Sequence, residues 1–169
     1  MNRTVLTLML VALALTSGAQ GKFERRKSTY TDGLYGFSIQ APKFPEAAAG
    51  SNVIPVMLLG PGEGGFSSNV NVVVQQVKQT REQFRKVSLG QFQAAALKVT
   101  SDQNKTVSGK EAIFLDYEGR QQGRDLRFLA LAVFDSNRVF LVTCTAPQKD
   151  FPKFDKEFRA CIDSFAVEQ

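Results

Sequence analysis

Hydrophobic and polar residues alternate along most of the chain after Tyr30, in short runs that are separated by turn residues. This two-residue period predicts β-strands, because successive side chains of a strand point to opposite faces of a sheet. We expect strands at residues 35–42, 53–59, 69–77, 104–107, 111–117, 126–134 and 139–145. The last two runs are apolar on both faces, so they should lie at the centre of an antiparallel sheet that is covered on both sides.

Two segments instead repeat apolar residues every three or four positions, which is the period of an α-helix. The first covers residues 80–97, where Thr80 and Gln83 form a candidate capping box. The second has an apolar stripe made of Phe151, Phe154, Phe158, Cys161, Ile162 and Phe165. One helix on each face would cover the sheet. The predicted fold class is therefore α+β, an α/β/α sandwich with a central antiparallel sheet.

The start of the chain differs from the rest, because Arg3 precedes an apolar run over residues 5–15 and small residues follow. This order is typical of a secretory signal peptide, and the run is shorter than the roughly 20 residues that a membrane-spanning helix needs. The alternative is an uncleaved membrane anchor. We predict a signal peptide at 1–21, a basic flexible segment at 22–29 and a single domain at 30–169. The mature protein would be periplasmic or secreted, with no integral membrane segment.

The chain is basic, with 21 Lys and Arg against 16 Asp and Glu and a formal net charge of +5. Part of this excess lies in the segment at 22–29, which we interpret as a solvated tail. The alternative is weak contact with an anionic surface. The segment has a single aromatic residue, so it offers no stacking platform for bases, and no nucleic acid is expected as a partner.

The composition excludes several kinds of catalytic and metal site. The chain has no His, which removes Ser-His-Asp and Cys-His catalysis and imidazole ligands to metals. Residues 60–65 match G-x-G-x-x-G, but a strand rather than a helix follows, so we interpret them as a flexible connection. Asp116 and Glu118 share one strand face, yet two carboxylates are too few for a cation site and indicate a solvated strand end. We predict no catalytic residue, no metal ligand and no cofactor.

Two further groups of residues are candidates for a structural or binding role. Cys144 and Cys161 suit an oxidising compartment, and a disulfide between them would close a loop of about 17 residues, worth about 3 kcal/mol. The alternative is two buried, reduced thiols. Arg120, Arg124 and Arg127 crowd one predicted hairpin and form a candidate docking patch, because arginine binds carboxylate and phosphate groups through paired donors.

Three short motifs, taken in order, resemble those of the PsbP-like superfamily, which includes photosystem II extrinsic protein P, Ran-binding Mog proteins and DcrB-type envelope proteins. They are Tyr35-Gly36-Phe37-Ser38-Ile39 ending at Pro42, Gly109-Lys110-Glu111-Ala112, and Ile162-Asp163-Ser164-Phe165. The resemblance spans roughly residues 30–167 and implies an α/β/α sandwich and an accessory or binding role without shared catalytic residues. The chain departs from the pattern at Lys43-Phe44-Pro45, where many relatives have a Trp. The metal role of photosystem members uses side chains that include His, so it does not transfer.

These observations predict an exported, non-enzymatic accessory or binding protein that interacts with an unknown protein partner, a macromolecule of the envelope or the extracellular space. The alternative from a different class is a small-ligand carrier with a pocket between sheet and helix. A hydrolase built on Asp, Glu and Lys is a third hypothesis.

Overall fold

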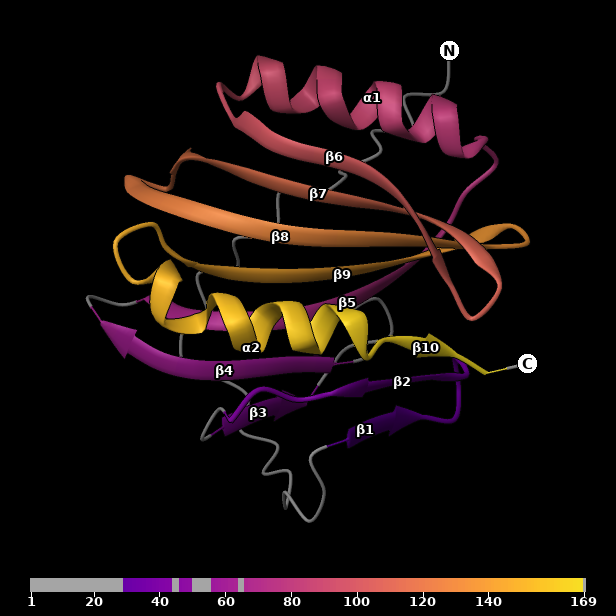
Figure 1. Cartoon of the computed structure of the whole chain (residues 1–169), viewed down its shortest axis with the longest axis horizontal. Helices are drawn as coiled ribbons and strands as arrows, with labels where there is room; N and C mark the ends of the chain where they lie inside the picture. Colours follow the sequence, from indigo (N-terminus) through magenta and orange to yellow (C-terminus); the bar gives the residue numbers. More distant parts are fainter. Residues whose placement is uncertain (1–28, 44–45, 50–55, 64–65, 169) are drawn as a thin grey trace.

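The computed structural model describes residues 29–43, 46–49, 56–63 and 66–168 (Figure 1). The predicted signal peptide at 1–21 and the basic segment up to residue 28 lie outside the described residues. No helix in the described ranges is long and apolar enough to cross a membrane.

A seven-stranded sheet forms the centre of the molecule. Its strands are β3 (Glu46–Ala49), β4 (Val56–Glu63), β5 (Phe66–Gln76), β6 (Lys98–Val107), β7 (Lys110–Gln121), β8 (Arg124–Asp135) and β9 (Arg138–Pro147). They lie in the order β3-β4-β5-β9-β8-β7-β6, and all neighbours are antiparallel. The prediction that β8 and β9 lie inside the sheet, and that the polar strand near residues 104–107 lies at its edge, is confirmed.

Helices cover opposite faces of this sheet, as predicted. The helix α1 (Arg81–Ala94) begins with the expected capping box between Thr80 and Gln83, and α2 (Phe151–Asp163) follows β9. Strand alternation produces two separate cores, because odd and even positions of each strand face different helices. Phe92 of α1 belongs to one core and Phe158 of α2 to the other. The predicted α+β sandwich with a central antiparallel sheet is confirmed.

The first helix ends earlier than the predicted residue 97. Ala96 takes a positive φ of 54°, and the amide of Leu97 donates to the carbonyl of Phe92 at 2.8 Å. A left-handed residue of this kind stops a helix and satisfies one of its last carbonyl groups. The chain then enters β6, which is longer than the predicted strand.

A second, three-stranded sheet was not predicted. It contains β1 (Thr29–Asp32), β2 (Phe37–Gln40) and β10 (Ala166–Val167), in the order β1-β2-β10. A strand of two residues is too short to show a period in sequence, and β10 is recognised only because it pairs with Phe37 and Ser38. This pairing joins the start of the domain to its end, and Figure 1 shows β10 and β2 side by side.

The glycine-rich segment at 60–65 is not simply the predicted flexible connection. Residues 60–63 belong to β4, and Gly62 and Glu63 pair with Ser67 and Phe66 after a register shift that begins at Leu59. A bulge suits this place, because Pro61 has no amide hydrogen to give to the ladder. Residues 64–65 lie outside the described part. The element that follows is β5, so this segment does not lead into a helix that could receive a phosphate.

Candidate functional site

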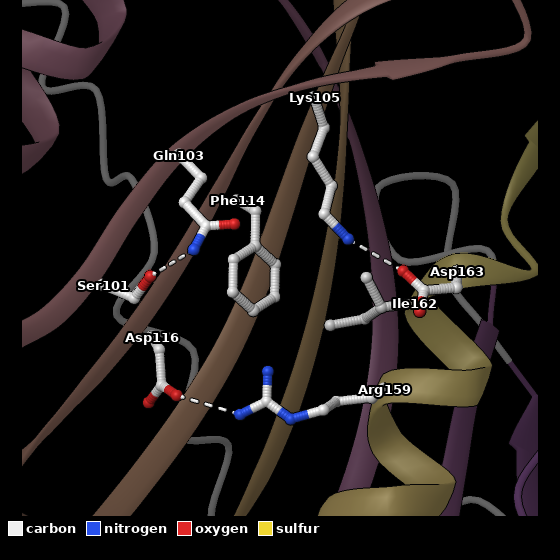
Figure 2. Close-up of a pocket in the computed structure, with 8 residues that line it drawn as sticks. All are labelled: Ser101, Gln103, Lys105, Phe114, Asp116, Arg159, Ile162 and Asp163. Atoms are coloured by element: carbon white, nitrogen blue, oxygen red, sulfur yellow. Dashed lines mark hydrogen bonds and ion pairs between the residues drawn. The ribbon is translucent and has the colours of Figure 1, made fainter.

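A pocket of about 220 Å³ lies between α2 and the edge of the sheet that β6 and β7 form (Figure 2). Ser101, Gln103 and Lys105 line it from β6, and Phe114 and Asp116 line it from β7. The remaining wall comes from α2 and consists of Arg159, Ile162 and Asp163. The pocket lies where α2, which packs against β8 and β9, extends toward the β6–β7 edge of the sheet.

Local structure of β6 directs alternate side chains into this pocket. The pairing of β6 with β7 shifts between Val99 and Ser101, and from there Ser101 and Gln103 face the pocket. The intervening side chain of Asp102 points to the opposite face, where Arg85 of α1 holds it at 3.1 Å. The helix on one face therefore fixes the strand that lines the pocket on the other.

Asp116 lines the pocket, and its residue is only 4% exposed. Its carboxylate accepts hydrogen bonds from Nε and Nη2 of Arg127 at 3.0 and 2.8 Å, and from Nη2 of Arg159 at 3.3 Å. Burial alone would raise the pKa of this carboxyl, but the hydrogen bonds and charge of Arg127, with help from Arg159, lower it. The prediction of a solvated strand end was wrong for Asp116, because α2 and β8 enclose it.

Charged side chains surround the ring of Phe114 at the centre of the pocket. Lys105 places its ammonium 5.0 Å from the ring centroid and pairs with Asp163 at 2.8 Å. Arg159 places its guanidinium carbon 5.9 Å from the same centroid and donates from Nε to Asp155 at 2.9 Å. Figure 2 shows these two cations approaching the ring from different directions. The pocket thus combines an aromatic floor with charges of both signs.

The structure separates the three arginines of the candidate docking patch. Arg127 is committed to Asp116 and stacks over the ring of Phe151 at 4.7 Å. Arg120 is exposed and donates to the carbonyl of Gly123 at 3.3 Å. Alternation along β7 and β8 places Arg124 on the face opposite to the other two. As a docking patch the group stays a prediction, with Arg120 its most exposed member.

The two cysteines face each other where α2 packs on β9. Both are buried and both are free thiols in this structure, so it shows no disulfide and the pairing stays a prediction. Sγ of Cys144 lies 3.9 Å from the carbonyl oxygen of Phe158. Burial, and then a hydrogen bond with Cys161, raise the pKa of the Cys144 thiol. A thiol of this kind is a poor nucleophile, which fits a structural position rather than a reactive one.

The described residues contain no group of three or more Cys, Asp or Glu side chains arranged to hold a metal ion. The carboxylates that the sequence singled out have other neighbours. Asp116 binds two arginines, and Glu118 lies 3.7 Å from the ammonium of Lys98 and accepts a hydrogen bond from Gln148. Their arrangement is that of ion pairs that join strands to each other and to α2.

The network around Asp116 was missed by sequence reasoning, although one signal pointed to it. Asp116 has the same strand parity as Ala112 and Phe114, so alternation alone places its carboxylate on a covered face. An inward carboxylate requires a cationic partner, since an unpaired buried charge is very unfavourable. Arg159 could not be identified as that partner, because nothing in the local pattern connects β7 to α2.

Comparison with known proteins identifies relatives by family model and by structure. A protein-family model described as PsbP matches residues 27–167. No curated protein sequence matches the chain. Among solved structures, cyanobacterial PsbP (CyanoP) from Synechocystis sp. PCC 6803 is similar, with a TM-score of 0.59 and 14% identity over 82% of this chain and 91% of that one.

Two further structures share the fold. LpqN of Mycobacterium tuberculosis, described as involved in cell envelope biogenesis, has a TM-score of 0.57 and 11% identity, covering 83% of this chain and 90% of that one. PA94 of Pseudomonas aeruginosa, described as a putative regulator of unknown function, has a TM-score of 0.54 and 17% identity, covering 80% and 93%. At such identities these structures establish the fold alone.

Proposed function

This chain belongs to the PsbP family, and from that premise we propose that it is a non-enzymatic accessory protein that works outside the cytosol and binds a macromolecule of the envelope or the extracellular space. The observation that carries the proposal is the family match, which covers almost the whole domain. Two neighbours in fold support it, since one is a cyanobacterial PsbP and another is described as involved in cell envelope biogenesis.

Export is the first part of the proposal, with residues 1–21 as a cleaved signal peptide. Cell fractionation of the native source, followed by N-terminal sequencing of the mature protein, tests it. We expect the protein in the periplasmic or secreted fraction, with a new N-terminus that follows Ala19 or Gly21. An intact Met1 in the cytosolic fraction would contradict this part and leave partner binding to be judged separately.

A disulfide between Cys144 and Cys161 would be consistent with this location, because disulfides form in oxidising compartments outside the cytosol. The two side chains are also neighbours, where α2 packs on β9. Protein isolated from the proposed compartment should resist alkylation after denaturation unless it is first reduced. A Cys161→Ser variant serves as the control, since its remaining thiol must react without reduction. Two alkylated cysteines in unreduced native protein would refute the pairing.

Binding of a protein partner is the second part, and the exposed end of the β7–β8 hairpin is the surface that we propose for it. Crosslinking in intact cells, followed by purification of the chain, identifies the partners. An Arg120→Glu variant should lose them, because Arg120 is exposed at this end of the hairpin, whereas Lys156→Glu on the exposed side of α2 should keep them. If the same crosslinks survive in both variants, this hairpin is not the contact surface.

A second function, a carrier of a small ligand, is favoured by one observation, the pocket of about 220 Å³ between the sheet and α2. Small-molecule sites are concave and combine apolar walls with a few converging polar groups, and Phe114 with its charged neighbours has this composition. Native mass spectrometry of protein purified from its source tests this function. A bound small molecule that is absent from denatured protein supports the carrier, and a bare chain contradicts it.

A further inference from the structure

We propose that the pocket between β6, β7 and α2 binds a small zwitterion of the α-amino acid type. The inference rests on the carrier function proposed above and names the chemical class of the ligand. The volume, about 220 Å³, lies below the range of about 300–1,000 Å³ typical of drug-sized ligands, so the ligand must be small.

The charges that line the pocket balance each other. Lys105 and Arg159 supply two positive charges, and Asp116 and Asp163 supply two negative ones. A simple anion would be repelled by the two carboxylates as it approached the cations. A simple cation would be repelled by Lys105 and Arg159 as it approached the carboxylates. A molecule with one charge of each sign can satisfy both kinds of group, and its own net charge of zero matches that of the lining.

Hydrogen-bonding capacity around Phe114 is left open for both ends of such a ligand. Arg159 uses Nε and Nη2 for carboxylates, while its Nη1 has no partner among the described residues. Gln103 donates from Nε2 to Ser101 at 3.1 Å, while its Oε1 has no partner within the same residues. We assign the ligand carboxylate to Nη1 of Arg159 and to Lys105, and the ligand ammonium to Asp163 and to Oε1 of Gln103.

The two ion pairs of the pocket differ in how firmly they are held, and the difference suits ligand entry. The side chain of Asp163 is 62% exposed and that of Lys105 is 34% exposed, so their contact is a weak surface pair that a ligand can replace. The side chain of Asp116 is only 6% exposed and is held by Arg127 on its other side. Asp116 therefore acts as a positioning residue that fixes Arg159 before the ligand arrives.

The test uses free L-amino acids together with two matched derivatives of each, the N-acetyl form, which keeps only the carboxylate, and the amide, which keeps only the ammonium. Binding to the purified mature protein is followed by amide chemical shifts and by thermal unfolding. We expect at least one amino acid to shift the signals of residues 101–105 and 159–163. Its affinity should be at least tenfold higher than that of either derivative.

Matched variants on β6 locate the site. Lys105→Met should weaken binding tenfold or more, whereas Lys98→Met should change it less than twofold, because Lys98 lies on the same strand, is 75% exposed and pairs with Glu118 outside the pocket. If Lys105→Met does not fold, Gln103→Ala takes its place. Gln103 is exposed, and within the described part of the chain its side chain bonds to Ser101 alone.

Each other outcome overturns the inference in a different way. Equal binding of an N-acetyl derivative and its parent would mean that the site takes anions, and the carrier function would stand. Binding that Lys105→Met leaves unchanged would place the ligand elsewhere. If no amino acid shifts any signal, the zwitterion inference fails, and a small molecule found by native mass spectrometry would still preserve the carrier function.

Discussion

Replacing Tyr117 by phenylalanine should stabilise the protein, although Tyr117 lies in the centre of a core. Its residue is 0% exposed, and its ring is stacked between Phe92 at 4.3 Å and Phe128 at 4.7 Å. The hydroxyl oxygen is buried and has no hydrogen-bond partner among the described residues. Burial accordingly raises the pKa of this phenol. Tyr117→Phe removes the unpaired oxygen and keeps both stacking contacts.

The expected gain follows from two opposing contributions. An unpaired buried polar group costs about 1–3 kcal/mol, which the variant recovers. The space left by one oxygen atom costs roughly 24 cal/mol per Å³, or about 0.3 kcal/mol for a volume of about 12 Å³. The net gain in the free energy of unfolding is about 1–2.5 kcal/mol. At about 2–4 °C per kcal/mol for a chain of this size, Tm should rise by about 2–10 °C.

Urea unfolding at neutral pH measures this difference, and equal m values in the two proteins would show that the unfolding transition is comparable. Tyr117→Ala is the control, because loss of the ring should destabilise the protein by about 3–5 kcal/mol. A Tyr117→Phe variant that is less stable than the parent would refute the reasoning. It would mean that the hydroxyl forms a hydrogen bond in solution that contributes more than its burial costs.

Three other substitutions test the site and its support. Asp116→Asn should lower the free energy of unfolding by about 2 kcal/mol, which calorimetry measures. This is less than the roughly 3–5 kcal/mol for a fully buried ion pair, because Arg127 and Arg159 are partly exposed. Folding lowers the pKa of Asp116, so the stability that its carboxylate contributes is fully present above the unfolded pKa of about 3.9 and is lost as pH falls through the folded pKa. In unfolding curves taken below pH 5, the Asn variant should lack this part of the loss of stability. Gly119→Ala should lower the free energy of unfolding by about 1–3 kcal/mol, because the new Cβ would lie 2.6 Å from the side chain of Leu97. An unchanged Tm would contradict this packing. Gly90→Ala in α1, where a Cβ meets no atom within 4 Å, should instead gain about 0.5–1 kcal/mol in the same assay.

The long strands, both helices and the capping box at Thr80 could be predicted because each depends on neighbours a few residues away. Alternation and the helical period are local properties of the chain, so they identify which residues turn inward without knowledge of what covers them. For the same reason the sequence indicated that β8 and β9 lie in the centre of the sheet. The fold class followed from this order of elements, and the family resemblance followed from three short motifs and their order.

The pocket and the short elements depended on the tertiary structure. Lys105 meets Asp163, Asp116 meets Arg159, and β10 pairs with β2 only after the whole chain has folded. Contacts between distant residues are selected by the combined packing of sheet and helices, and their partners leave no periodic trace in the sequence. Composition alone showed that imidazole chemistry is absent. Which carboxylates are buried, and which cations surround Phe114, was decided by the way α2 lies across the sheet.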